Sequence, residues 1–135
     1  MIYGQSLGGA VSIDLVAKNK GTGDIKALIL ENTFLSIAKM IPSVFPIAKY
    51  LTPLCHQYWR SEEMLPQITD VPVLFLSGLQ DEIVPPSHMK GLFRACRSKQ
   101  VVWREFASGD HNNTVGERGY FEAIAEFLEK YVDKR

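Results

Sequence analysis

The sequence predicts a doubly wound α/β fold with a mostly parallel sheet. Three apolar runs, at residues 27–30, 71–77 and 101–106, lack the alternation of a half-exposed strand. Continuous runs of this kind are typical of parallel strands that are covered on both faces. Stretches with apolar residues at helical spacing separate and follow them, at residues 8–18, 87–97 and 117–132. This alternation of strands and helices indicates α/β layers.

Each predicted helix has apolar residues at three- and four-residue spacings, which places them on one side of the helix. We expect these sides to pack on the sheet. The first helix presents Val11, Leu15 and Val16; the second, which opens with Pro86, presents Met89, Leu92 and Phe93; and the last presents Phe121, Ile124, Ala125, Leu128 and Tyr131.

The interval between Asn32 and Asp70 interrupts this rhythm, because a crossover between parallel strands needs far fewer residues. Its apolar, proline-broken sequence predicts a small helical cap insertion at about residues 34–68, over the carboxyl edge of the sheet. The whole chain, residues 1–135, is expected to form one partial domain. Apolar side chains of the insertion either line a substrate pocket or form the core of the cap, and the substrate-binding candidates are Phe34, Met40 and Phe45.

The composition excludes several classes of partner. Lys and Arg number 15 and Asp and Glu number 15, so the formal net charge is zero and neither nucleic acid nor an acidic membrane face is an expected partner. Cys55 and Cys96 lie far apart without the spacing of a metal site, and we expect neither a metal nor an organic cofactor. No stretch resembles a membrane span or a signal peptide, so this chain shows no targeting signal.

The segment Gly4-Gln5-Ser6-Leu7-Gly8 matches the pattern G-x-S-x-G, in which a serine projects from a tight turn between a strand and a helix. The strained backbone of such a turn leaves little room nearby, so we expect Gly4 and Gly8 to relieve crowding. The N–H of Leu7 opens the following helix and is the predicted oxyanion-hole donor. The pattern taken alone also fits a glycine-rich turn in which Ser6 caps the helix.

Two further loops carry residue types that activate a serine. Asp81 follows the strand at residues 71–77, and His111 follows the strand at residues 101–106. Both lie just beyond the carboxyl ends of strands, where open α/β sheets place their sites. Serine, acid and histidine also occur in the order of one large class of serine hydrolases. Ser6, Asp81 and His111 are therefore the predicted catalytic residues.

Other acidic residues and histidines compete for these roles. Glu31, which ends the preceding strand, is the main rival acid, and Asp81 is favoured because it lies on a turn followed by Val84 and Pro85. Four further residues are expected to have structural roles: His56 in the cap, His88 in the first turn of a helix, Asp110 in shaping its loop, and Asp14 in an ion pair.

The chain resembles the α/β-hydrolase superfamily over its whole length, and its motifs are similar to those of the membrane-anchored serine hydrolases of the bud-emergence type. The resemblance implies that Ser6 is the nucleophile, that Asp81 and His111 complete the triad, and that the substrates are acyl esters or thioesters, with protein depalmitoylation among the activities of relatives. It also implies a membrane anchor near the N-terminus of a full-length protein. The motifs are residues 4–9, 30–34, 78–85 and 109–112.

Members of that family place several strands and helices before the nucleophile strand, which is here reduced to residues 1–3. A loop in that earlier part donates the second oxyanion N–H. We therefore expect this chain to be a C-terminal half with little or no turnover alone, since one oxyanion donor contributes about two to three orders of magnitude in rate. The competing expectation is a non-catalytic, truncated product that acts as a binding or interaction module. The sequence leaves open the acyl donor, the choice among esterase, thioesterase and peptidase, and the oligomeric state.

Overall fold

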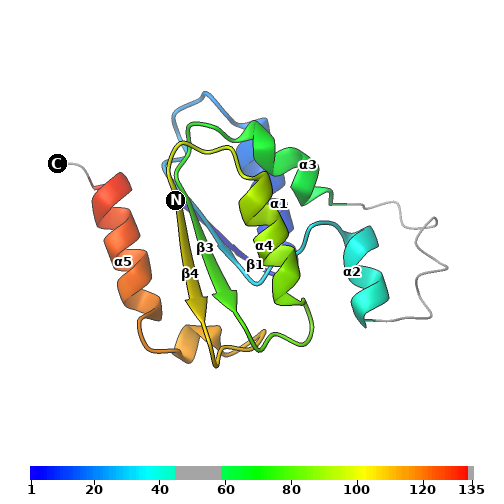
Figure 1. The fold of residues 1–135 in the computed structure, drawn as a ribbon. Coiled ribbons are helices and arrows are strands. Elements are labelled where there is room, and N and C mark those ends of the chain that lie inside the picture. Colours follow the sequence, from blue (N-terminus) through cyan, green and yellow to red (C-terminus); the bar gives the residue numbers. More distant parts are fainter. Residues whose placement is uncertain (45–58, 134–135) are drawn as a thin grey trace.

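A computed structural model describes residues 1–44 and 59–133 and contains a four-stranded sheet in the order β1-β2-β3-β4. The strands are β1 (Ile2–Gln5), β2 (Leu28–Glu31), β3 (Val73–Gly78) and β4 (Val101–Phe106). Every neighbouring pair is parallel, with Tyr3 beside Ile29, Ile29 beside Leu74, and Leu74 beside Val102. The predicted parallel sheet is confirmed, and all four strands end at the same edge (Figure 1).

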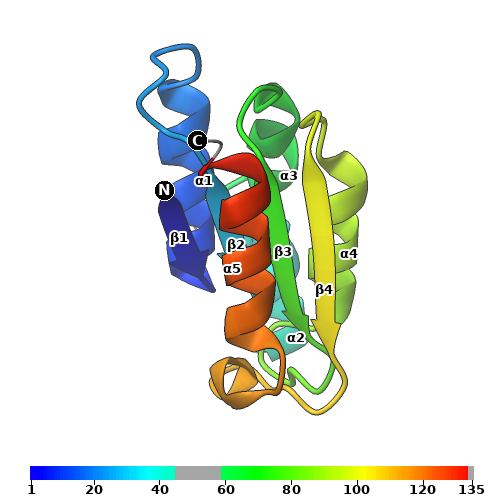
Figure 2. The same ribbon diagram turned by 90° about the vertical axis from the view of Figure 1, so that its left-hand side faces the viewer.

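Helices cover both faces of the sheet (Figures 1 and 2). The first face carries α1 (Leu7–Lys18), α3 (Ser61–Met64) and α4 (Pro86–Ala95), and the second carries α5 (Tyr120–Tyr131). Because the strands are added in chain order on one side, right-handed crossovers bring the connecting helices to the same face. The remaining helices are α2 (Ile37–Val44) and the 3-10 turns η2 (Leu65–Gln67) and η3 (Thr114–Gly116).

The core explains why the central strands are apolar without alternation. Successive residues of β2 and β3 point to opposite faces, and both faces are covered. One buried cluster combines Leu28, Leu30, Val73 and Phe75 with Ile13 and Val16 of α1 and with Met89 and Leu92 of α4. The other combines Ile29, Leu74 and Leu76 with Ala123 and Phe127 of α5.

Some predicted boundaries and faces are corrected by the structure. The last helix begins at Tyr120 and not at residue 117, because Gly119 has a φ of 89° and a 3-10 turn precedes it. Its buried residues are Tyr120, Ala123 and Phe127, and the predicted Ile124, Leu128 and Tyr131 are partly buried against them. Phe121, which is 66% exposed, and the exposed Ala125 were wrongly placed on the packed side. β4 was expected to be covered on both faces, but it is the edge strand of this sheet, and its Arg104 is exposed.

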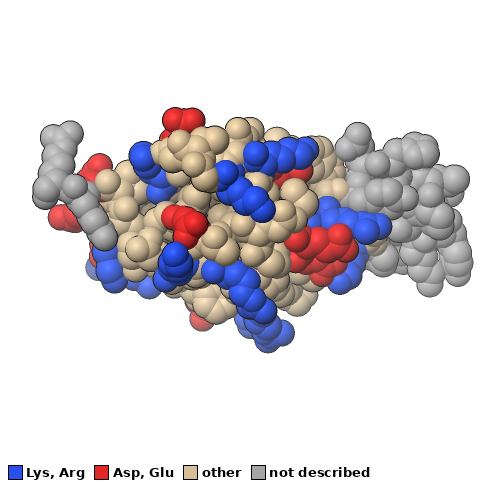
Figure 3. Space-filling view, turned by 90° about the horizontal axis from the view of Figure 1, so that it is seen from above, with Lys and Arg blue, Asp and Glu red and all other residues tan. Residues whose placement is uncertain are grey.

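Charged groups of both signs mix at the end of the sheet where the strands begin. Figure 3 looks onto this end and shows Lys and Arg interspersed with Asp and Glu. Lys18 pairs with Asp14 at 2.7 Å, as expected for Asp14, and Lys99 pairs with Asp70 at 2.9 Å. This end of the molecule therefore has no patch of a single sign. Within residues 1–44 and 59–133, no helix combines the length and apolar character needed to cross a bilayer.

The exposure of residues on the outer side of α1 differs from the predicted packing of that helix on the sheet. Val16 is buried as expected, but Val11 and Leu15 are each 44% exposed, and Leu7 is half exposed. These last three residues recur every four positions and form what we call the α1 stripe (Leu7, Val11 and Leu15). β1 next to it is also an outer strand, since it pairs with β2 alone among the described strands. The described part of the chain thus leaves one flank of its sheet and an apolar stripe uncovered.

We expect the 135-residue chain to self-associate through this flank, because open strand edges and exposed apolar stripes favour pairing with other chains. Replacing Val11 and Leu15 together by Lys should raise the monomer fraction in sedimentation velocity. Val115→Lys is a matched control, because Val115 has the same exposure as Val11 but lies in η3. A double variant that associates as strongly as the unmodified chain would contradict the assignment of the flank.

Candidate active site

The backbone at Ser6 has the conformation that the G-x-S-x-G pattern predicts. Ser6 lies between β1 and α1 with φ 52° and ψ −123°, a region that residues with a side chain rarely occupy. Three hydrogen bonds hold it: the Ser6 N–H donates to Glu31 O at 3.0 Å, Thr33 Oγ1 donates to Ser6 O at 2.7 Å, and the Gly9 N–H donates to Ser6 O at 3.0 Å. The Ser6 hydroxyl does not cap α1, which removes the alternative explanation of the motif.

The glycines of the motif have different reasons to be small. A Cβ at Gly4 would clash with the Gly8 carbonyl oxygen and with Ser12 Oγ, so Gly4 relieves crowding as predicted. A Cβ at Gly8 would meet nothing within 4 Å, so the same prediction for Gly8 is wrong. The second tight position is Gly9, where a Cβ would come to 2.6 Å from the Thr33 side chain. Close packing of α1 on the end of β2 therefore requires Gly9.

The predicted acid and base are in contact. His111 Nδ1 lies 2.8 Å from Asp81 Oδ2, and the two side chains are 12% and 1% exposed. The other oxygen of this carboxylate, Asp81 Oδ1, accepts the N–H groups of Ile83 at 2.9 Å and Val84 at 2.8 Å. These two bonds fix the rotation of the carboxylate, so that only Oδ2 faces the imidazole. The remaining nitrogen of His111, Nε2, is then available for proton transfer.

The serine turn and the histidine loop meet at the same edge of the sheet. Gln5, next to Ser6, donates from Nε2 to the His111 main-chain oxygen at 2.8 Å. Among the described residues no hydrogen bond joins the Ser6 hydroxyl to His111, so the link between the two runs through Gln5. Catalytic hydrogen bonds of unliganded enzymes are often long and tighten in the substrate complex. The structure thus brings Asp81 and His111 together directly and brings Ser6 beside them.

Glu31, the rival acid, has other partners. Its side chain is 1% exposed and accepts hydrogen bonds from the hydroxyls of Tyr3 and Tyr120. The two hydroxyls lie 3.3 Å from each other. Burial, and then the bond to Glu31, raises the pKa of Tyr3 to about 12, and the same two causes raise the pKa of Tyr120. Glu31 therefore ties β1 and α5 to β2 and does not orient His111.

This tyrosine–glutamate cluster predicts a loss of stability in alkali. The folded chain favours both phenols in the protonated form, so their contribution is complete below a pH of about 10, the ordinary tyrosine pKa, and declines above it. The contribution of Tyr3 is lost as the pH reaches about 12, and that of Tyr120 is still falling there. We expect Tyr120→Phe to lower the free energy of unfolding at pH 8 by about 1–3 kcal/mol, since a buried hydrogen bond to a carboxylate disappears. The variant should also depend less on pH between 10 and 12. Urea titrations at several pH values measure both effects, with Tyr131→Phe as the control; equal pH slopes in all proteins would refute the role of the cluster.

The other residues singled out from the sequence have varied surroundings. Phe34 is buried with Ala10 and Val84, and Met40 packs against this cluster, so a role for either in substrate binding stays a prediction. Phe45, the third candidate for substrate binding, and His56 lie outside the described residues. His88 is buried and its Nδ1 accepts the Leu35 N–H at 3.1 Å, which confirms a packing role. Burial, together with the positive charge of Lys39, lowers the pKa of His88.

Asp110 shapes its own loop, as predicted, because its Oδ1 accepts the N–H groups of Asn112 and Asn113 at 2.9 and 2.8 Å. The sequence reasoning gave no role to Asn32, whose amide bonds to both the Asp81 and the His111 loops. The available signal was its position directly after a strand that ends at the site. Tyr3 and Tyr120 were missed as partners of Glu31 because they lie far apart in the chain.

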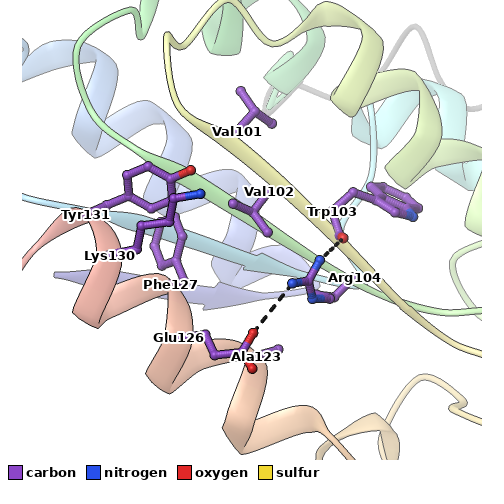
Figure 4. Close-up of a pocket in the computed structure, with 9 residues that line it drawn as sticks. All are labelled: Val101, Val102, Trp103, Arg104, Ala123, Glu126, Phe127, Lys130 and Tyr131. Atoms are coloured by element: carbon purple, nitrogen blue, oxygen red, sulfur yellow. Dashed lines mark hydrogen bonds and ion pairs between the residues drawn. The ribbon is translucent and has the colours of Figure 1, made fainter.

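Of the hollows on the described surface, two bear on the position of the substrate. A hollow of about 360 Å³ lies beside His111 and is lined by Gln80, Glu82, Ile83, Ser108, Asp110 and Asn112. A groove of about 400 Å³ lies between β4 and α5, where Arg104 reaches Glu126 at 3.6 Å (Figure 4). Only the first adjoins the predicted triad, so it is the candidate substrate cavity. Within residues 1–44 and 59–133, no three His, Cys, Asp or Glu side chains form a group suited to a metal ion.

Solved structures share the fold of this chain. The chain matches an acylaminoacyl peptidase of Pyrococcus horikoshii with a TM-score of 0.77 and 16% identity, over 99% of this chain and 24% of that one. It matches a monoacylglycerol lipase of Paleococcus ferrophilus with a TM-score of 0.67 and 21% identity, over 96% and 67%. No family model matches the chain.

Proteins with similar sequences include proteins named as α/β hydrolases. Protein bem46 of Schizosaccharomyces pombe is 49% identical over 95% of this chain and 42% of its own length. The alpha/beta hydrolase domain-containing protein WAV2 of Arabidopsis thaliana is 39% identical over 100% and 48%. The chain has the fold of the α/β hydrolases and resembles proteins of that superfamily over its whole length. The chain spans about half the length of these relatives. A further relative, from Saccharomyces cerevisiae, is described as an uncharacterized membrane protein; it is 46% identical over 95% of this chain and 45% of its own length. The region shared with these relatives contains β1 to β4 and the loops that carry Ser6, Asp81 and His111.

Proposed function

We propose that this α/β hydrolase is a serine hydrolase of acyl esters or thioesters. Ser6 is the nucleophile, His111 is the general base, and Asp81 is the carboxylate that orients His111. The observation that carries the proposal is the bond between His111 Nδ1 and Asp81 Oδ2, at 2.8 Å, beside a serine with φ 52°. A strained serine and a histidine–carboxylate pair at the same edge of a sheet have few structural reasons to coincide.

The geometry suggests how each group acts. Asp81 holds the imidazole as the tautomer with a proton on Nδ1, which leaves Nε2 to accept the proton of the Ser6 hydroxyl. Ser6 Oγ then bonds to the acyl carbon, and the proton passes from Nε2 to the departing alcohol or thiol. Water then hydrolyses the acyl-enzyme: His111 takes a proton from the water as its oxygen bonds to the acyl carbon. The bond from that carbon to Ser6 Oγ breaks, Ser6 Oγ regains the proton from His111, and the carboxylic acid product leaves. No metal or organic cofactor takes part in these steps.

The oxyanion that forms in each half-reaction needs N–H donors. Leu7 is the first residue of α1, and an N–H in the first turn of a helix has no partner inside the helix. The positive end of the helix dipole adds to its effect on a nearby anion. Leu7 supplies one donor, and a second is expected from the part of the relatives that this chain does not span. We therefore keep the expectation of little turnover by residues 1–135 alone.

A fluorophosphonate probe tests the nucleophile in a protein extended to the length of the relatives. Ser6→Ala should abolish labelling, because the probe forms its bond with the activated serine. Ser108→Ala is the control, since Ser108 is an exposed serine that lines the hollow beside His111. Labelling that survives Ser6→Ala, or that disappears with Ser108→Ala, rejects the assignment.

The role of the carboxylate has its own test. Asp81→Asn keeps the shape of the side chain but favours the wrong imidazole tautomer, and we expect a fall in the rate of ester hydrolysis of about 10⁴-fold. Glu31→Gln is the matched control, because Glu31 is also a buried carboxylate at the end of a strand but bonds to tyrosines. If Glu31→Gln lowers the rate more than Asp81→Asn does, in proteins of equal stability, the role of triad carboxylate would pass from Asp81 to Glu31.

A further inference from the structure

Asn32, which directly follows β2, is the buried side chain that connects the loop of Asp81 with the loop of His111. It is 1% exposed and has a φ of 44°, and its main-chain N–H donates to Leu76 O at 3.3 Å. Asparagine tolerates this left-handed conformation better than most residues do. The backbone turn at the end of β2 therefore aims the Asn32 amide away from its own strand and toward the ends of β3 and β4.

Both the oxygen and the nitrogen of the Asn32 side-chain amide form hydrogen bonds. Asn32 Oδ1 accepts the Gly78 N–H at 2.8 Å, at the start of the loop that carries Asp81. Asn32 Nδ2 donates to the Asp110 main-chain oxygen at 3.1 Å and to Thr114 Oγ1 at 3.1 Å. Asp110 and Thr114 stand on either side of His111 in the chain, and the His111 main-chain oxygen is itself 3.5 Å from Nδ2. One planar group thus bonds to the acid loop and to both sides of the base.

The two loops are also in direct contact, which makes their relative position sensitive to this group. The Gln80 N–H donates to the Gly109 oxygen at 2.8 Å, and a Cβ added at Gly78 would come to 2.7 Å from the same oxygen. Nothing larger than hydrogen fits between them, so a shift of one loop must move the other. The distance from His111 Nδ1 to Asp81 Oδ2, 2.8 Å, depends on that relative position.

We propose that Asn32 is a positioning residue, which holds His111 against Asp81 by bonding to both of their loops at once. The catalytic meaning of this inference rests on the proposed function. Its structural content, that the His111–Asp81 bond depends on the Asn32 amide, does not. The requirement for an amide follows from its partners: a carboxylate would place an oxygen against the Asp110 carbonyl, and an apolar side chain would leave the Gly78 N–H buried without the acceptor it has in Asn32 Oδ1.

The bond can be observed through the proton on His111 Nδ1, which NMR detects when a carboxylate holds it and protects it from water. The experiment uses the 135-residue chain and its Ser6→Ala form, so the result does not depend on whether Ser6 reacts. Asn32→Gly removes the amide and still permits a positive φ. We expect the Nδ1 proton to exchange with water about tenfold faster or more in this variant, because exchange reports local opening of the two loops.

A second variant separates positioning from general stability. Asn32→Asp keeps the size and the backbone preference, but its ionised carboxylate faces the Asp110 oxygen. Burial raises the pKa of such a carboxyl, and its protonated form can donate one hydrogen bond in place of the amide. We therefore expect the protected Nδ1 proton to be lost at pH 7 and to return as the pH falls toward 5. Should Asn32→Gly not fold, this pH-dependent recovery carries the test.

The control removes a comparable bond at the opposite end of the sheet. Ser98 Oγ donates to Val71 O at 2.7 Å, before β3 and β4 begin, and Ser98→Ala should lower stability without changing the exchange of the His111 Nδ1 proton. Equal exchange in Asn32→Gly and the unmodified chain, or equal acceleration by Ser98→Ala, would overturn the proposal. Labelling by the fluorophosphonate probe that survives Ser6→Ala would instead reject the hydrolase mechanism. The dependence of the His111–Asp81 bond on Asn32 would still hold.

Discussion

The backbone conformation of Ser6 is the constraint on which the site depends. A residue with a side chain at φ 52° and ψ −123° costs on the order of 1–3 kcal/mol, and it persists only where its surroundings hold it. Here the Glu31 carbonyl and the Thr33 hydroxyl fix the two sides of the peptide at Ser6, and the absence of side chains at Gly4 and Gly9 lets α1 approach the sheet. In this conformation the Ser6 hydroxyl makes no capping hydrogen bond to α1. A relaxed turn would let the hydroxyl cap α1, and it would then be less free to act as the proposed nucleophile.

The end of β2 organises the site without supplying a catalytic group. Three successive residues have separate tasks: Glu31 binds two tyrosines on the side of α5, Asn32 bonds to the loops after β3 and β4, and Thr33 holds the Ser6 carbonyl. The division follows from geometry, because adjacent side chains at a strand end point in different directions. It also explains why a carboxylate at position 31 does not compete with Asp81. Its Oε2 already accepts hydrogen bonds from two phenols, and burial together with this contact raises the pKa of both phenols.

Sequence reasoning succeeded where a local pattern determines the outcome. The parallel strands, the serine turn and the loops of Asp81 and His111 follow from apolar runs, the spacing of Gly4 and Ser6, and the positions of polar residues after strands. It failed where long-range contacts decide. Nothing local shows that Tyr3 and Tyr120 meet at Glu31, or that Gly9 is the tight position and Gly8 is not. The faces of α1 and α5 were misjudged for a related reason, since periodicity identifies an apolar stripe but does not say which part of it meets the sheet.

The position of the α1 stripe links the open flank to the chemistry. Leu7 takes part in both, since its N–H is the proposed oxyanion donor and its side chain begins the stripe that continues through Val11 and Leu15. A chain segment that covered the stripe would also lie beside the Ser6 turn and exclude water from it. Exclusion of water strengthens a hydrogen bond to a developing oxyanion, because the local dielectric falls. Covering this flank and completing the oxyanion hole are therefore not independent requirements. The apolar contact that would stabilise the sheet edge is the same contact that would prepare the serine for acyl transfer.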